Sequence, residues 1–174
     1  MRCDSDFVAL NHEFEALAEA ILAAALGSTF SSDCILPRPF NRNLKEVLEC
    51  FRSKFRENIG IESVKTFEAS STSGSNSILG HYLHQRSGSH LGKMGAVVNI
   101  SFKNSENFSK LEDFSRLIAR QTVALNDLNI TIPILLDSTY LFEPVRKVSE
   151  FIKSKELEIN DQILIEDLYF AKIK

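Results

Sequence analysis

Asp4-Ser5-Asp6-Phe7-Val8-Ala9-Leu10-Asn11 is the stretch around which the chain is organised. From Asn11 onward, apolar residues recur at three- and four-residue steps between 14 and 25, so they share one face of a helix. Asn11 can cap this helix, and Gly27 is suited to end it. Phe7 therefore precedes the helix, outside its buried stripe. The residues alone leave two interpretations: Phe7 packs back on the core, or it forms with Asp6 a projecting pair aimed at a partner.

Composition narrows the class of protein. The 174 residues are 44% hydrophobic and 25% charged, which suits a domain with a real core. The formal net charge of -3 argues against a protein that holds nucleic acid through phosphate contacts. Three cysteines at wide spacing form neither a zinc pattern nor a secreted disulfide framework, which favours a reducing compartment. No apolar run reaches membrane-spanning length, so we expect no membrane partner. From the net charge we also expect no direct contact with nucleic acid.

Further helices are predicted from apolar periodicity. One follows Asn43, with residues 44, 47, 48, 51 and 55 on one face, and ends near 58–60. Another is opened by a capping box of Ser109 and Glu112 and runs to Leu125. A later helix is expected to begin at Pro144, with Val145 among its inward residues.

Strands are predicted at 61–68, 78–84 and 94–102. The last has the cleanest alternation, with residues 94, 96, 98, 100 and 102 on one face. A meander of these three antiparallel strands is the economical topology. Residues 163–173 predict a closing strand whose alternation slips near Asp167. The sum is an α+β fold, with three principal helices packed on an antiparallel sheet.

Residues that could carry chemistry are few. His81, His84 and His90 gather near one hairpin and are the candidates for a metal site. Positions three apart in a strand point to opposite faces, so His81 and His84 cannot converge on one ion. The sequence contains no nucleophile elbow and no recognisable catalytic cysteine motif. We therefore expect no catalytic residue, no metal and no cofactor, and a protein that is not an enzyme.

The opening stretch, with its helix, resembles the signature of the translation elongation factor Ts family, T-D-F-V-A-x-N. Ser5 stands for the threonine, and Leu10 replaces a usually basic residue. Further stretches follow in the family's order. Residues 56–61 resemble its G-E-N-I-x-I, 79–84 its G-x-Y-x-H strand, 93–98 its R-I-G-V-L-V strand, 118–124 its I-A-M-H-x-A-A helix and 136–152 its L-x-x-Q-P-F-V segment with the helix after it. The resemblance covers nearly the whole chain.

The resemblance implies a guanine nucleotide exchange factor that binds the GTPase elongation factor Tu and releases its GDP during translation elongation. In that family the Asp-Phe pair is a wedge near the magnesium and phosphate region of the GTPase. The R-I-G strand and the helix histidine add contacts. By correspondence, the implied partner-binding residues are Asp6, Phe7, Val8, Asn11, Met94, Gly95 and Gln121.

The sequence also departs from the family's pattern. Arg56 stands where a glycine is usual, Met94 replaces isoleucine and Gln121 replaces histidine. The small helical domain before the core and the long helical insertion after residue 124 have no counterpart. We therefore expect an N-terminal core subdomain at 1–126, a reduced C-terminal segment at 127–174 packing on it, and a monomer that binds its partner one-to-one.

Two further expectations concern lineage and function. A serine-rich insert and a longer hairpin turn favour an organellar protein, specifically a mitochondrial one, with another organelle or the cytoplasm as alternatives. The alternative function is a structural or ribosome-associated protein derived from this family without exchange activity.

Overall fold

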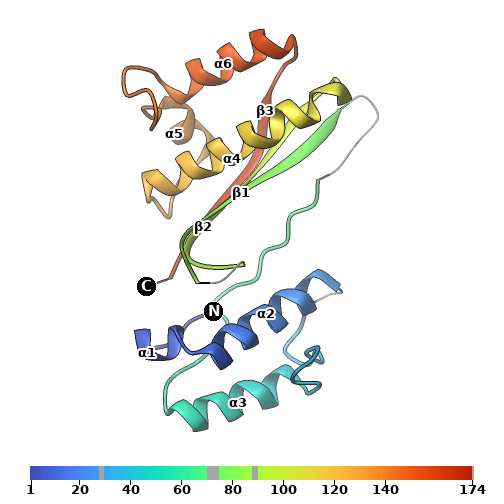
Figure 1. Ribbon diagram of the computed structural model, residues 1–174, viewed down its shortest axis with the longest axis vertical. Helices are drawn as coiled ribbons and strands as arrows, with labels where there is room; N and C mark the ends of the chain where they lie inside the picture. The colour runs from blue at the N-terminus through green and yellow to red at the C-terminus, as the bar shows by residue number, and fades with distance from the viewer. Residues whose placement is uncertain (28–29, 70–74, 88–89, 174) are drawn as a thin grey trace. The chain divides into compact units, whose positions relative to one another are not determined.

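The computed structural model describes residues 1–27, 30–69, 75–87 and 90–173. Its contacts divide the chain into two compact units, each with its own core (Figure 1). Unit 1 comprises the described residues of Met1–Thr66, Arg86–Gly92 and Ile173–Lys174, and unit 2 those of Phe67–Gln85 and Lys93–Lys172. The chain passes between the units after residues 66, 85, 92 and 172. The boundary expected at residue 126, between a core subdomain and a C-terminal segment that packs on it, stays a prediction.

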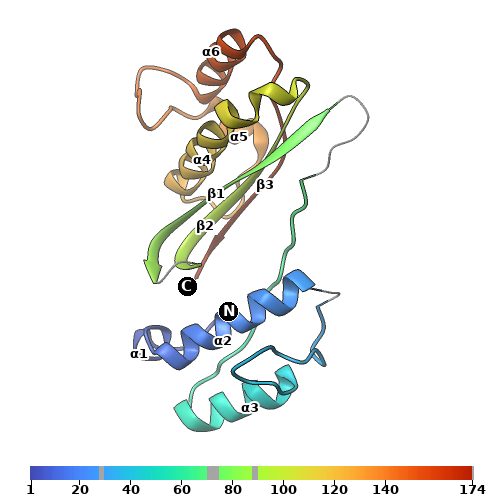
Figure 2. The same ribbon diagram turned by 45° about the vertical axis from the view of Figure 1, so that its right-hand side comes forward.

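Unit 1 is built from α1 (Asp6–Ala9), α2 (His12–Gly27) and α3 (Leu44–Phe55). The expected caps are present: Asn11 Oδ1 accepts a hydrogen bond from Glu13 N–H at 2.9 Å, and Asn43 Oδ1 accepts one from Lys45 N–H at 2.9 Å. Helices α2 and α3 lie side by side in both views (Figures 1 and 2). Their shared core consists of Val8, Phe14, Leu17, Ala20, Ile21, Leu36, Leu44, Val47, Leu48, Phe51 and Ile59.

The strand predicted at 61–68 is wrong, because residues 61–69 form no regular element. The backbone pairing lies just before them, in an isolated bridge between Arg2 and Gly60. Side chains 62–66 are all exposed, so this segment has no buried face to fix a strand register. The predicted meander therefore lacks its first strand.

A three-stranded antiparallel sheet has the order β1 (Asn76–Ser87), β2 (Leu91–Phe102), β3 (Leu164–Lys172). It belongs to unit 2 except for the end of β1 and the start of β2, at residues 86–87 and 91–92. The C-terminal strand supplies the third position, with Met94 opposite Lys172 and Ser101 opposite Leu164. The pairing shifts register between Asn99 and Ile100, whose partners are residues 167 and 165. This shift explains why the alternation of the predicted closing strand slips near Asp167.

Three helices complete unit 2: α4 (Phe108–Leu125), α5 (Ile132–Asp137) and α6 (Val148–Ile159). They share one core with the buried face of β2, and α4 runs across the sheet in Figures 1 and 2. That core consists of Val98, Ile100, Phe102, Leu111, Phe114, Ile118, Ala119, Leu135, Tyr140, Val148, Ile152, Ile159 and Ile163. The prediction of an α+β fold with helices packed on an antiparallel sheet is confirmed.

The starts of two helices differ from the prediction. Helix α4 begins at Phe108, directly after a 3-10 turn, η1 (Ser105–Asn107), so Ser109 lies inside the first turn and forms no capping box with Glu112. Helix α6 begins at Val148, beyond the turn that contains Pro144. Val145 is 100% exposed in that turn and does not face the core.

The η1 turn is held by the carboxylate of Asp161. This carboxylate accepts hydrogen bonds from the backbone N–H groups of Lys103 (3.2 Å) and Asn104 (2.8 Å) and from Asn107 Nδ2 (3.2 Å). Burial acts to raise the pKa of Asp161, but these hydrogen bonds and one from Gln162 N–H outweigh it and lower the pKa below the ordinary value of 3.8.

Candidate functional site

The candidate site starts at α1, a helix of four residues. Ser5 has an extended backbone, and its Oγ accepts a hydrogen bond from Val8 N–H at 3.3 Å, which caps the helix. At the other end Leu10 N–H donates to the Asp6 carbonyl at 3.1 Å, and Asn11 N–H donates to the Val8 carbonyl at 3.0 Å. Asn11 then caps α2 with its side chain. The Asp-Phe pair therefore sits on a short helix of its own, immediately before α2.

This short helix sends its side chains in different directions. Val8 is 1% exposed and belongs to the core of unit 1. Phe7 is 77% exposed and Leu10 is 63% exposed, and residues three apart on a helix share a face. Asp6 is exposed as well. The helix thus presents an aromatic ring and an aliphatic side chain beside a carboxylate, and Phe7 does not pack back on the core.

Met94 and Gly95 lie on β2, in unit 2. Met94 is half-buried and packs against a small cluster of Ala96, Val123 and Phe170. Gly95 lies close to β1, since a Cβ at this position would come within 2.9 Å of Leu83 Cδ2. The two residues therefore form part of the sheet's packing.

Gln121 lies inside unit 2, where it is 1% exposed. Its Nε2 donates to Thr139 O at 2.9 Å and to Ser138 Oγ at 3.2 Å, and its Oε1 accepts from Leu141 N–H at 2.8 Å. These bonds tie the segment between α5 and α6 to the buried face of α4. In this conformation the side chain of Gln121 supports the fold from within.

The predicted site residues thus fall into two groups. Asp6, Phe7, Val8 and Asn11 come together around α1 in unit 1. Met94, Gly95 and Gln121 belong to unit 2.

Sequence reasoning missed two residues near α1, Leu10 and Glu57. In the sequence Leu10 stands out as a departure from the family pattern, although its spacing of three from Phe7 predicts a shared face once both lie on one helix. Glu57 belongs to the stretch 56–61 that resembles the family's G-E-N-I-x-I. Its carboxylate binds the chain just before α1, and no signal in the sequence indicates that pairing.

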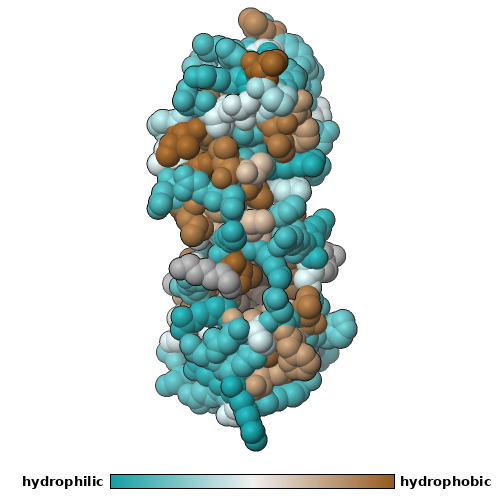
Figure 3. All heavy atoms as spheres, turned by 90° about the vertical axis from the view of Figure 1, so that its left-hand side faces the viewer, coloured by the Kyte–Doolittle hydropathy of each residue, from teal (hydrophilic) through white to brown (hydrophobic). Residues whose placement is uncertain are grey.

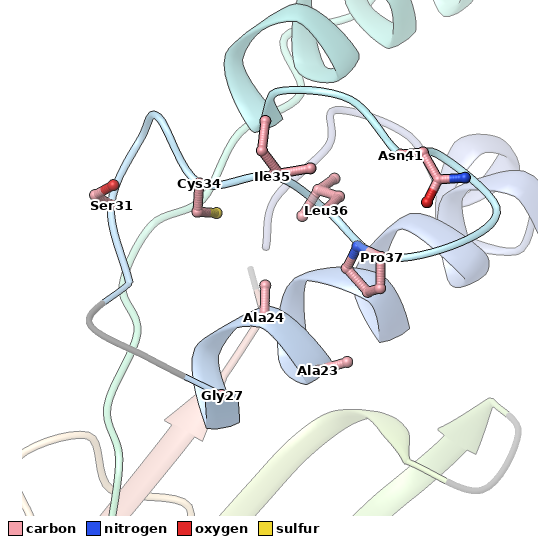
Figure 4. Close-up of a pocket in the computed structure, with 9 residues that line it drawn as sticks. All are labelled: Ala23, Ala24, Gly27, Ser31, Cys34, Ile35, Leu36, Pro37 and Asn41. Carbon is pink, nitrogen blue, oxygen red and sulfur yellow. The ribbon is translucent and has the colours of Figure 1, made fainter.

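A pocket of about 570 Å³ lies in unit 1, between the end of α2 and the loop that precedes α3 (Figure 4). Its lining consists of Ala23, Ala24, Gly27, Ser31, Cys34, Ile35, Leu36, Pro37 and Asn41. None of these nine residues carries a carboxylate, an imidazole or an ammonium group. The lining therefore supplies no acid–base pair for catalysis.

Other features that could carry chemistry are equally limited. Within residues 1–27, 30–69, 75–87 and 90–173, no three His, Cys, Asp or Glu side chains group closely enough to hold a metal ion. In the same part of the chain, no helix has the length and apolar character needed to cross a membrane. Burial and then the nearby Glu57 carboxylate raise the pKa of the Cys3 thiol, which disfavours its reactive thiolate.

Unit 2 also exposes apolar side chains. They come from the chain between α4 and α6 and include Leu128, Ile134, Leu141, Phe142 and Val145. Figure 3 shows brown, hydrophobic areas on the face of unit 2 that carries α4 and α5. Among these side chains, the Phe142 ring makes a cation–π contact: the guanidinium of Arg120 lies 4.9 Å from the centre of the ring.

Comparison with known proteins identifies a matching family model. The model is described as Elongation factor TS, and it matches residues 4–133. This range contains all the residues of the candidate site, from Asp6 to Gln121.

Individual relatives carry the same name. Elongation factor Ts of Neorickettsia sennetsu is 30% identical over 111 residues, which cover 62% of this chain and 37% of that protein. The protein named Elongation factor Ts, mitochondrial, of Heterostelium pallidum is 28% identical over 143 residues, covering 76% of this chain and 40% of that protein. Elongation factor Ts of Clostridium acetobutylicum is 26% identical over an alignment of 181 residues, covering 100% of this chain and 53% of that protein. The chain thus spans about half, or less, of the length of these relatives.

Proposed function

The chain belongs to the elongation factor Ts family, and on that premise we propose that it is a guanine nucleotide exchange factor that binds elongation factor Tu and promotes release of GDP. The physical basis is linkage. A protein that binds the nucleotide-free GTPase more tightly than the GDP-bound form must, reciprocally, weaken the binding of GDP. This role needs contacts that disturb the nucleotide site, and it needs no catalytic side chain.

The observation that carries the proposal is the exposure of Phe7 on a helix whose next residue is anchored in the core. Phe7 is 77% exposed and Val8 is 1% exposed. An exposed phenylalanine leaves apolar surface in water, and burying it against a partner contributes roughly 1.5–3 kcal/mol. We propose that Phe7 inserts near the magnesium and phosphate region of the GTPase and that Asp6 forms charge-assisted hydrogen bonds there.

The other predicted contact residues take different parts in this proposal. Val8 holds α1 against the core of unit 1 because its side chain is buried, and Asn11 holds the end of α1 because its side chain caps α2. Gln121 acts from inside unit 2 by fixing the segment that leads to Leu141. Met94 and Gly95 are proposed to contact the GTPase from the start of β2. Their packing within the sheet does not by itself require a partner.

The test is to time the release of a fluorescent GDP from elongation factor Tu in the presence of the chain. Phe7→Ala should slow exchange by about ten- to a hundredfold, since it removes the burial energy of the ring. Because the ring is exposed, the same change should lower the free energy of unfolding by less than about 1 kcal/mol. Leu26→Ala is a matched control, since Leu26 is 80% exposed at the opposite end of α2.

Each result separates the competing interpretations. A folded Phe7→Ala protein that releases GDP at the wild-type rate contradicts the wedge. A wild-type chain that binds elongation factor Tu without accelerating release contradicts the exchange function and supports a structural role for this family member.

We also propose that the chain is a monomer that binds one GTPase molecule, which light scattering of the free chain and of the complex would measure. We propose a mitochondrial location. It is supported by the relative named as mitochondrial at 28% identity, whereas the other relatives described above are bacterial.

A further inference from the structure

The position of α1 depends on a carboxylate far away in the sequence. Glu57 lies in the turn that follows α3, and its Oε2 accepts hydrogen bonds from the backbone N–H groups of Asp4 (3.1 Å) and Ser5 (3.0 Å). Its Oε1 accepts a further hydrogen bond from the Ser5 hydroxyl. One side chain thus binds three donors on the two residues that lead into α1. Hydrogen bonds to a charged acceptor are stronger than neutral ones.

The same two segments are joined by reciprocal bonds. The Asp4 carboxylate accepts a hydrogen bond from Asn58 N–H at 3.0 Å. Arg2 and Gly60 exchange backbone hydrogen bonds at 2.8 and 3.1 Å. Residues 2–5 are therefore held along residues 57–60 by several bonds, and Glu57 supplies those nearest to α1.

The turn that carries Glu57 is itself fixed. Arg52 Nε, in the last turn of α3, donates to the carbonyl of Ile59 at 2.7 Å. Ile59 is fully buried in the core of unit 1. The position of Glu57 is therefore fixed relative to α3. The hydrogen bonds that Glu57 accepts in turn fix the start of α1 relative to α3.

Ser5 connects this carboxylate to the helix. Its hydroxyl donates to Glu57 and also accepts from Val8 N–H, so it caps α1 while it is held by Glu57. A helix of four residues has no stability of its own, because helix nucleation is unfavourable. The direction in which α1 presents Phe7 therefore depends on the burial of Val8 and on the contacts at the two ends of the helix.

We propose that Glu57 is a positioning residue for Phe7: it holds Ser5, and through Ser5 it keeps α1 in the orientation that presents the ring to a partner. This inference rests on the proposed exchange function. Without Glu57, α1 samples several orientations, and only a fraction of the molecules is ready to bind. The apparent affinity for a partner falls by that fraction, while the complex, once formed, still contains an inserted ring.

The first test measures exchange as a function of chain concentration. Glu57→Ala should raise the concentration of chain that gives half-maximal GDP release by about tenfold and leave the maximal rate within about twofold of wild type. Phe7→Ala, in contrast, should lower the maximal rate. Glu57→Gln keeps one oxygen acceptor and should give an intermediate shift. Glu49→Ala removes an exposed carboxylate from α3 and should equal wild type.

The second test is a double-mutant cycle. If Glu57 acts through Phe7, adding Glu57→Ala to a Phe7→Ala chain should change exchange by less than about twofold. Equal effects of Glu57→Ala in the presence and absence of the Phe7 ring would overturn the inference, because Glu57 would then act independently of the wedge. So would a Glu57→Ala chain that exchanges like wild type.

The third test needs no partner. Amide hydrogen exchange of Glu57→Gln and Glu57→Ala should show faster exchange at Asp4, Ser5 and Val8, whose N–H groups are held directly or through Ser5, with α3 unchanged. Unchanged protection at these amides overturns the positioning role. A wild-type chain without exchange activity refutes the proposed function itself. This outcome is distinguished from failure of the positioning role because the wild-type chain is measured before any variant.

Discussion

Gly80, on β1, lies unusually close to the backbone of α4. A Cβ added at this position would lie 2.2 Å from the carbonyl oxygen of Ser115 and 2.3 Å from its carbonyl carbon. Backbone atoms inside a helix cannot rotate away as the end of a side chain can. The strand and the helix would have to separate by about 1 Å to reach an ordinary contact of 3.4 Å. Gly80→Ala should therefore disturb the whole interface between β1 and α4.

The magnitude follows from two opposing terms. Forcing an extra carbon into a closely packed interface costs about 1–3 kcal/mol, and more where backbones must move. Replacing glycine by alanine restricts the unfolded chain, which returns about 0.4–1 kcal/mol. Because the clash is with backbone and is severe, the first term lies at the upper end. We expect Gly80→Ala to lower the free energy of unfolding of unit 2 by about 2–2.5 kcal/mol, the difference between these two terms.

Gly95→Ala is the matched control on the neighbouring strand. Its added Cβ would meet Leu83 Cδ2 at 2.9 Å, and this atom is the end of a side chain that can change rotamer. We expect a loss below about 1 kcal/mol. The chain has no tryptophan, and its tyrosines, at 82, 140 and 169, all lie in unit 2. Tyrosine fluorescence during urea unfolding therefore reports on this unit. Equal losses for the two variants would refute the close approach of β1 to α4.

Three further outcomes follow from single contacts. Gln121→Ala should lower the free energy of unfolding by about 1–3 kcal/mol, measured by the same fluorescence, because it removes the hydrogen bonds that this buried side chain makes to Thr139 O and Leu141 N–H. Arg56→Gly should raise the free energy of unfolding by about 0.5–1 kcal/mol, measured as a higher melting temperature, because Arg56 has a φ of 56° that favours glycine. The lowered pKa of Asp161 means that its stabilising effect is present above pH 3.8 and is lost as the pH falls through the lowered value, so the stability difference between wild type and Asp161→Asn should be larger at pH 6 than at pH 2.5.

Periodicity predicted the elements that have one buried face. Helices α2, α3 and α4 and strand β2 each bury a single face, and that face appears in the sequence as a repeat of three to four residues or of two. The failed strand at 61–68 has no buried face: Ile61 packs against the core of unit 1, Phe67 contacts the ring of Tyr169, and the residues between them are exposed. Which strand fills the third position of the sheet depends on contacts between residues distant in sequence, and periodicity carries no information on those.

The candidate site was predictable in part. The family pattern indicated Asp6 and Phe7, but the exposure of Phe7 depends on α1 being a separate helix, which a segment of four residues cannot signal through periodicity. Gln121 did leave a signal. It follows Ile118 by three residues and precedes Leu125 by four, so it belongs to the apolar stripe of α4. A polar residue on such a stripe is expected to be buried with its hydrogen bonds satisfied, and this is what the structure contains.

A wedge residue has two requirements that oppose each other in a small protein. It must be exposed, so that its burial energy becomes available only in the complex, and it must be held in one orientation, so that binding does not spend that energy on ordering the chain. Phe7 meets the first requirement, and its neighbours meet the second. Val8 is buried directly after it, and Ser5, two residues before it, is bonded to a carboxylate mounted on α3. If Phe7 inserts as proposed, exposure and orientation are supplied by different side chains. Comparing substitutions at Phe7 and Glu57 then separates the free energy of inserting the ring from the free energy of holding it in one orientation before binding.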